Sequence, residues 1–184
     1  MKTLTAMKVL NEWSFRDRTV FTVSDLRKLF PDISAKTFSE GLRRLVSRGV
    51  LVNAARGIYV NPATAAPKTH LLEKIAVTLR RGEYSYLSLE SALSEYGVIS
   101  QIPMGQITVM TSGRSASIDT PYGGIAFTHT SRSVVDILNG TIASDRPLRI
   151  AKVDVALRDL KRTGRNLHLV SPAEYEDVLR ETTS

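Results

Sequence analysis

The chain has 184 residues, a formal net charge of +7 at pH 7 and no cysteine. With 42% apolar and 23% charged residues it has the composition of a folded protein, so wholesale disorder is excluded. The lack of cysteine excludes a disulfide scaffold, thiolate catalysis and cysteine-built zinc sites. Because neither a signal peptide nor a run of about 18 apolar residues is present, we expect a cytoplasmic protein without a membrane anchor.

The positive charge is concentrated near the N-terminus. Residues 1–60 hold eleven Lys and Arg against five Asp and Glu, whereas residues 61–184 hold fourteen against thirteen. A small basic module joined to a nearly neutral one suggests binding to a polyanion such as nucleic acid. The alternative, that the charge only aids solubility, stays open on charge alone.

The first 60 residues divide into elements in a definite order. The pattern predicts a helix at 4–13, a short strand at 19–22, a helix begun by Ser24 and stopped by Pro31, a helix from Ser34 to Gly49, and a hairpin of 50–53 with 58–60. This order is typical of a winged helix-turn-helix domain, which we place at residues 1–61. A generic helical domain with a hairpin is the alternative.

The helix after Ser34 is the candidate recognition helix. Phe38, Leu42 and Leu45 fall on one stripe of a 3.6-residue period, so the opposite face is polar and available to a major groove. The residues that we expect to contact double-stranded DNA are Ser34, Lys36, Thr37, Ser39, Glu40, Arg43, Arg44 and Ser47, with Arg56 on the tip of the hairpin.

Glu40 has two interpretations. A carboxylate facing phosphates is repelled unless it accepts a hydrogen bond from a cytosine amino group, which makes Glu40 a candidate for base readout. Equally, it could be a helix-surface residue paired with Arg43 or Arg44.

Residues 62–68 contain two prolines and small side chains, which indicates a linker. The remainder, residues 69–184, mixes predicted helices near 71–79, 88–96, 134–138, 153–160 and 172–180 with strand-like runs at 107–110, 118–120 and 125–128. The predicted fold class is therefore α+β, with an N-terminal winged helix-turn-helix domain and a C-terminal mixed α+β domain.

A second basic stretch occurs in this C-terminal domain. It is a possible DNA-backbone patch or protein-docking face, made of Arg149, Lys152, Arg158, Lys161, Arg162 and Arg165. A solvated helix face with i,i+4 pairs such as Asp154–Arg158 is an equal alternative.

Residues with catalytic spacing are not evident. The three histidines lack ligand spacing, no phosphate-binding glycine motif or serine-hydrolase elbow occurs, and Asp119 has no acidic partner on a neighbouring predicted strand. His129 alternates with Ile125 and Phe127, so we expect it in a core or an interface. We therefore predict no catalytic residue, no metal site and no cofactor, and expect that the protein is not an enzyme.

Four sets of segments together carry a family resemblance: Tyr86 to Leu93 running on to Gly97, Ile107 to Val109 with Ile125 to His129, Ala156 to Leu160, and the hairpin residues Gly57 to Tyr59. They resemble the AbiEi family of antitoxins from bacterial abortive-infection systems. One segment departs from the family: Lys152 to Val155 stand where the family has a proline–glutamate–lysine run. Toxin contacts made by that run are therefore not carried over.

The resemblance implies a transcriptional autorepressor and antitoxin. In that family the winged helix binds operator repeats, and the C-terminal domain supports repression and neutralisation of a nucleotidyltransferase-like toxin, without necessarily forming a stable complex with it. We also expect self-association of this protein on DNA. The alternative is a stand-alone regulator whose C-terminal domain dimerises or senses a ligand, without a toxin partner.

Overall fold

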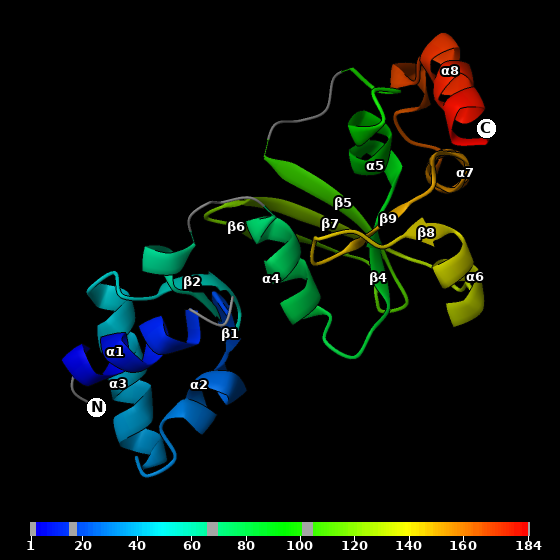
Figure 1. Ribbon diagram of the computed structural model, residues 1–184. Coiled ribbons are helices and arrows are strands. Elements are labelled where there is room, and N and C mark those ends of the chain that lie inside the picture. Colours follow the sequence, from blue (N-terminus) through cyan, green and yellow to red (C-terminus); the bar gives the residue numbers. More distant parts are fainter. Residues whose placement is uncertain (1–2, 15–17, 66–69, 101–104, 184) are drawn as a thin grey trace. The chain divides into compact units, whose positions relative to one another are not determined.

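The computed structural model describes residues 3–14, 18–65, 70–100 and 105–183 (Figure 1). The chain divides into two compact units, Met1–Leu79 and Arg80–Ser184. Both mix helices with an antiparallel or mixed sheet, so the α+β class is confirmed. Each unit is described by itself below.

The first unit follows the predicted element order. Its elements are α1 (Thr3–Ser14), β1 (Val20–Thr22), α2 (Val23–Leu29), α3 (Ala35–Ser47), β2 (Val52–Ala55), β3 (Ile58–Val60), a 3-10 helix (Pro62–Thr64) and α4 (Leu71–Leu79). The three strands form an antiparallel sheet in the order β1-β3-β2. Buried side chains from α1, β1, α2 and α3 pack together in one hydrophobic core.

Local capping explains where α3 begins and ends. The Ser34 hydroxyl accepts a hydrogen bond from the Thr37 amide, and Gly49 adopts a φ of 68° beyond the last turn. Both predicted boundaries are therefore confirmed, because a serine satisfies a free amide and glycine enters the left-handed region without strain.

The start of α2 differs from the prediction. Thr22, not Ser24, is its N-cap: the Thr22 hydroxyl accepts from the Asp25 amide at 3.0 Å, and the Asp25 carboxylate accepts from the Thr22 amide at 2.9 Å. Asp25 is also paired with Arg18 at 2.8 Å. This capping box satisfies the backbone amides of Thr22 and Asp25 at once. A cap at Ser24 could not form such a box with the Asp25 carboxylate.

The predicted linker is partly folded, so the domain boundary lies elsewhere. Asn61 is 2% exposed; its side chain accepts from the Ala63 amide and donates to Asn11 in α1. Helix α4 packs against β1 and β3 and buries Leu71 and Ile75. The division therefore falls after Leu79, whereas the sequence placed it at residues 62–68, of which 66–68 lie outside the described residues.

The second unit is built on a six-stranded sheet. Its elements are β4 (Ser85–Leu87), α5 (Leu89–Glu95), β5 (Gln106–Thr111), β6 (Ala116–Thr120), β7 (Gly123–His129), α6 (Val134–Asn139), β8 (Thr141–Ile142), β9 (Arg149–Ala151), α7 (Val153–Thr163), a 3-10 helix (Leu167–Leu169) and α8 (Pro172–Thr183). The strand order is β6-β7-β5-β4-β9-β8, with β5–β7 and β4–β9 parallel and the other pairs antiparallel.

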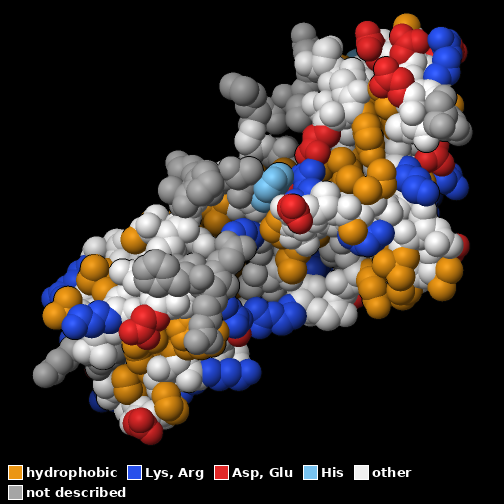
Figure 2. Space-filling model, in the orientation of Figure 1, with side chains coloured by type: hydrophobic (Ala, Val, Ile, Leu, Met, Phe, Trp, Pro, Cys, Tyr) orange, Lys and Arg blue, Asp and Glu red, His pale blue; other side chains and the backbone are white. Residues whose placement is uncertain are grey.

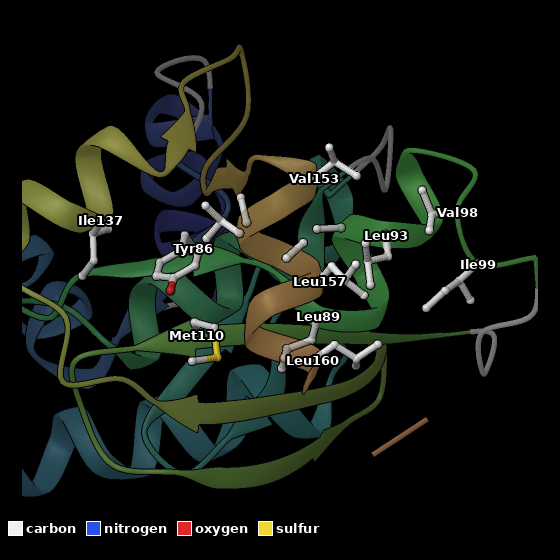
Figure 3. Close-up of a cluster of buried hydrophobic side chains, with 14 residues drawn as sticks. Tyr86, Leu89, Leu93, Val98, Ile99, Met110, Ile137, Val153, Leu157 and Leu160 are labelled. Carbon is white, nitrogen blue, oxygen red and sulfur yellow. The ribbon is translucent and has the colours of Figure 1, made fainter. Parts of the chain in front are cut away.

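Helices α5 and α7 pack together and form the core of the second unit (Figure 3). Leu89 and Leu93 of α5 are fully buried, as is Leu160 of α7. Their spacing at i,i+4 in α5 presents one apolar stripe to α7, which is why these short helices are stable only in contact with each other and the sheet.

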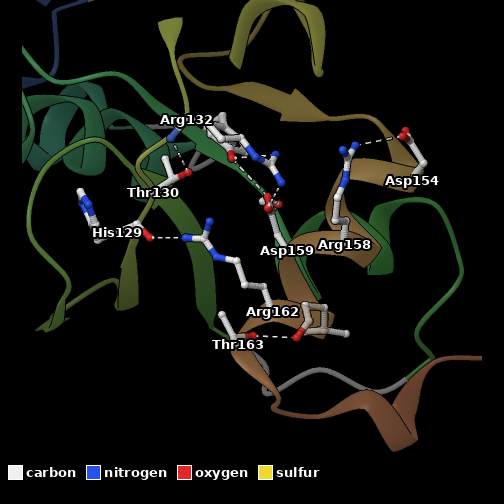
Figure 4. Close-up of polar contacts among 11 residues, drawn as sticks. His129, Thr130, Arg132, Asp154, Arg158, Asp159, Arg162 and Thr163 are labelled. Atoms are coloured by element: carbon white, nitrogen blue, oxygen red, sulfur yellow. Dashed lines mark hydrogen bonds and ion pairs between the residues drawn. The ribbon is translucent and has the colours of Figure 1, made fainter. Parts of the chain in front are cut away.

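A buried polar cluster joins α7 to the sheet. Asp159 is fully buried; one of its carboxylate oxygens lies 2.6 Å from the Arg132 guanidinium, and the other accepts hydrogen bonds from Ser88 at 2.8 Å and Tyr86 at 3.2 Å (Figure 4). Ser88 stands at the N-cap of α5, but its hydroxyl serves Asp159 instead of the helix. Residues that are far apart in the sequence thus meet at the Asp159 carboxylate.

Tyr86 in this cluster gives a pH prediction. Burial raises the pKa of its phenol to about 12, and the Asp159 carboxylate adds to the increase. The folded state holds this proton more tightly than the unfolded chain, so its stabilising effect is complete below pH 10 and is lost as the pH rises towards about 12. We expect the free energy of unfolding to fall by about 2–3 kcal/mol more in the parent than in Tyr86→Phe over this range.

Urea denaturation of both proteins at several pH values from about 9 to 12 measures that difference, with other titrating groups cancelling between the two. Parallel pH profiles would show that Tyr86 titrates as it does in the unfolded chain.

His129 is exposed, so the core position that the sequence allowed is wrong. Ile125 and Phe127 of the same strand are buried, but His129 is the last residue of β7 and extends past the core. Its ring lies 2.9 Å from the Gly113 carbonyl oxygen.

Candidate nucleic-acid interface

The outward face of α3 carries the predicted contact residues. Phe38, Leu42 and Leu45 are buried, and they leave the other face of the helix to solvent. All nine predicted residues are exposed: Ser34, Lys36, Thr37, Ser39, Glu40, Arg43, Arg44, Ser47 and, in the turn between β2 and β3, Arg56.

The cations of this face are not engaged internally. Within the described residues, the side chains of Lys36, Arg43, Arg44 and Arg56 form no hydrogen bond or ion pair. Other arginines of the first unit are used by the fold: Arg48 donates to the Thr3 hydroxyl, and Arg27 and Arg18 bond to α2 and its flanks. Figure 2 shows Lys and Arg side chains spread over the visible face of this unit, with few acidic ones.

The hydroxyl groups are partly committed to the helix. Ser34 donates to the Thr37 hydroxyl, Ser39 to the Ala35 carbonyl and Ser47 to the Arg44 carbonyl, at 3.0–3.1 Å. Each oxygen keeps a lone pair, but a hydroxyl that donates to a ligand must first leave its helical partner. The charged side chains are therefore the main groups available for contact.

Glu40 stands in the middle of this cationic face. It lies one turn from Lys36, Arg43 and Arg44, yet the described residues show no ion pair between Glu40 and any of them. The paired arrangement that the sequence left open is therefore not present.

The hairpin presents Arg56 through a tight turn. Gly57 has a φ of 76°, a conformation that favours glycine, and its carbonyl accepts from the Val23 amide at 3.0 Å. The register of β2 against β3 shifts between Asn53 and Ala55. The tip is thus held to the start of α2 while Arg56 remains exposed.

The second basic stretch is divided among separate structural contacts. Arg149 donates hydrogen bonds to the hydroxyl and the backbone carbonyl of Thr141, at 2.6 Å and 2.9 Å. These bonds hold β9 against β8. Arg165 pairs with buried Glu90 at 3.1 Å, and Arg162 donates to the His129 carbonyl (Figure 4).

Arg158 forms the predicted pair with Asp154 at 3.3 Å, and Lys152 and Lys161 are exposed. The six cations therefore do not form one face of unengaged charges. The arrangement favours the interpretation as a solvated helix face with local pairs.

A turn at Thr111–Ser115 has the residues of an anion-binding loop but not its chemistry. The Ser112 amide donates to the Tyr84 carbonyl, and the Gly113 amide donates to the Thr111 hydroxyl. The Glu83 carboxylate accepts from the Ser112 hydroxyl at 2.6 Å, where an anion would have to lie. This loop is therefore a polar turn.

The described parts of the chain lack the features of a metal centre and of a membrane span. They contain no group of three or more His, Cys, Asp or Glu side chains placed to hold a metal ion. They also contain no helix that is both long and apolar enough to cross a bilayer.

No curated protein matches the sequence. The model of a family of unknown function, DUF6088, matches residues 18–166, and this range includes α3, the hairpin and most of the second unit. The chain therefore belongs to the DUF6088 family.

Proposed function

We propose that the first unit is a winged helix-turn-helix domain that binds double-stranded DNA, with α3 in the major groove and the β2–β3 hairpin as the wing. The observation that carries the proposal is the outward face of α3, where Lys36, Arg43 and Arg44 are exposed and without a partner among the described residues. Such cations suit phosphate oxygens, and Arg56 on the hairpin adds another.

The dimensions of α3 agree with this use. A helix of 13 residues is about 20 Å long, and its polar face is wide enough to combine base contacts with phosphate contacts. Residues near its start, Lys36, Thr37, Ser39 and Glu40, are the candidates for base edges, because recognition helices enter the groove with their N-terminal half.

We further propose that the protein is a transcriptional repressor of its own operon and acts as the antitoxin of a toxin–antitoxin pair, not as an enzyme. The support is the resemblance of Tyr86–Leu93 and Ala156–Leu160 to AbiEi antitoxins. The partner would be a nucleotidyltransferase-like toxin. Expressing the adjacent reading frame with and without this protein tests that role, since growth arrest that this protein fails to relieve refutes it.

Selection of binding sites from random double-stranded DNA tests the DNA-binding proposal. We expect the parent to enrich one motif, and Glu40→Ala to lose preference at one position that is cytosine in the parent motif, by about 1–3 kcal/mol of discrimination. Non-specific binding should be unchanged or stronger, since a negative charge leaves the interface. The matched control is Glu12→Ala, an exposed carboxylate on α1.

The outcomes separate two claims. If no motif is enriched and the chain does not shift duplex DNA at low salt, the DNA-binding proposal is wrong. If Glu40→Ala selects the same motif as the parent, DNA binding stands but Glu40 does not read a base.

A further inference from the structure

The sheet of the second unit has one long free edge. Its strand order places β6 and β8 at the two ends, and β6 pairs only with β7 among the described strands (Figure 1). Strand β8 has only two residues, which are too few to hold another strand. Strand β6 has five, Ala116–Thr120, so its outer side offers a row of backbone groups that no described strand pairs with.

The hydrogen bonds of β7 show which backbone groups of β6 point outward. The Gly124 amide donates at 2.8 Å to the carbonyl of the residue that precedes β5, so Gly124 turns its backbone groups towards β5. Because this direction alternates along a strand, Ile125 faces β6, where it pairs with Ile118. Ser117 and Asp119 flank Ile118, so their N–H and C=O groups point away from β7.

The side chains at these two positions are also unengaged. Ser117 and Asp119 are exposed, and neither the hydroxyl nor the carboxylate has a hydrogen-bond or ion-pair partner within the described residues. The two side chains lie on the same face of β6, because they are two positions apart. A hydroxyl donor and a carboxylate acceptor thus stand beside the two sets of outward backbone groups.

We propose that β6 pairs antiparallel with β6 of a second copy, about a two-fold axis at Ile118. This register places Ser117 of each copy opposite Asp119 of the other, and the outward N–H and C=O groups of both residues pair across the axis. Each Ser117 hydroxyl is then placed to donate to the Asp119 carboxylate of the second copy. The edge is thus complementary to itself in both backbone and side-chain hydrogen bonding.

The residues around β6 disfavour the other two-fold registers. An axis at Asp119 would set the two Asp119 carboxylates against each other and would place Ser117 opposite Pro121, which has no N–H to donate. An axis at Ser117 would need the backbone of Ser115, which lies outside β6 and whose hydroxyl accepts from a β7 amide at 2.9 Å. The axis at Ile118 uses only residues within the strand and brings no like charges opposite each other.

The size of the contact sets the strength of the dimer. Ile118 is partly buried and lies on the axis, so it packs against Ile118 of the second copy on the face opposite Ser117 and Asp119. One short strand per copy belongs at the low end of interface sizes. We expect a reversible dimer with a dissociation constant on the order of 10 to 100 μM.

Sedimentation velocity of the full chain without DNA, from about 5 to about 500 μM, tests the proposal independently of DNA binding. We expect a shift from monomer to dimer over this range, and at least a tenfold weaker dimer in Ser117→Pro, which removes an outward N–H from each copy. Proline is tolerated in an edge strand where the N–H faces solvent, so the monomer should still fold. The matched control is Ser117→Thr, which keeps the N–H and the hydroxyl and should dimerise at least as tightly as the parent.

A charge introduced at the same position tests the register. In Ser117→Lys each new ammonium group faces Asp119 of the second copy, so the dimer should become several-fold tighter, and adding Asp119→Ala should remove the gain. With an axis at Ser117 the two ammonium groups would oppose each other. A weaker dimer in Ser117→Lys therefore overturns the register.

Amide hydrogen exchange followed by NMR at about 500 μM locates the contact. The Asp119 amide should be protected in the parent and exchange rapidly in Ser117→Pro, whereas the Ile118 amide, which faces β7, should be protected in both. A chain that stays monomeric at this concentration overturns the proposal and leaves the edge open to a strand of another protein. A dimer that Ser117→Pro does not weaken also overturns it, because the copies then associate through another surface.

Discussion

Replacing Arg43 and Arg56 together by alanine should reduce the slope of log K against log salt for DNA binding by roughly two units. Each cation that neutralises a phosphate releases condensed counterions, and each contributes close to one unit to this slope. Both side chains are exposed and unengaged by the described residues, one on α3 and one on the hairpin, so both are available to the DNA backbone. The measurement is a titration of duplex DNA at several salt concentrations between about 50 and about 200 mM.

A variant that removes two charges elsewhere provides the comparison. Lys8→Ala with Arg180→Ala lowers the net charge by the same amount, from an exposed position on α1 and one on α8. Its slope should remain close to that of the parent. If both double variants lower the slope equally, the effect comes from net charge, and Arg43 and Arg56 do not contact phosphate.

Asp159→Ala should lower the free energy of unfolding by about 3–5 kcal/mol. Asp159 is fully buried, and Arg132, its ion-pair partner at 2.6 Å, is only 18% exposed. The substitution leaves that guanidinium largely buried without its counter-charge and removes the acceptor of the Tyr86 and Ser88 hydroxyls. Chemical denaturation followed by circular dichroism measures the loss.

The control for this change is Asp154→Ala on the same helix. Asp154 is half exposed in its pair with Arg158, so its loss should alter the stability by no more than about 0.5 kcal/mol. Adding Arg132→Ala to Asp159→Ala should recover part of the loss, because the uncompensated charge is removed. A loss below 1 kcal/mol in Asp159→Ala would mean that solvent or another group replaces the carboxylate.

Local rules in the sequence determined the elements around the candidate site. Ser34 and Gly49 set the ends of α3 through one side-chain cap and one left-handed residue, and the spacing of Phe38, Leu42 and Leu45 set its buried face. Exposure of Lys36, Arg43 and Arg44 follows from that spacing alone. These features depend on residues within a turn or two, so a sequence pattern is sufficient to predict them.

A sequence pattern did not predict which of two neighbouring residues caps α2. Ser24 and Thr22 both have the right hydroxyl for starting α2, and Asp25 decides between them, since its carboxylate completes a capping box only with Thr22. Likewise Asp154 and Arg158, which form an ion pair, have the same i,i+4 spacing as Glu40 and Arg44, between which the described residues show none. Surface pairs of this kind differ by only a few tenths of a kcal/mol, so spacing does not determine which one forms.

The sequence by itself determined the α+β class, the polar face of α3 and the basic character of the first 60 residues, because these follow from composition and short-range periodicity. Only the tertiary structure decided that α4 packs on the first unit, that β4 lies between β5 and β9, and that Asp159 pairs with Arg132. It also decided that Arg149 and Arg165 brace the fold. Most of these contacts join residues far apart in the sequence, and their energy arises from burial and desolvation, which exist only once the chain has folded.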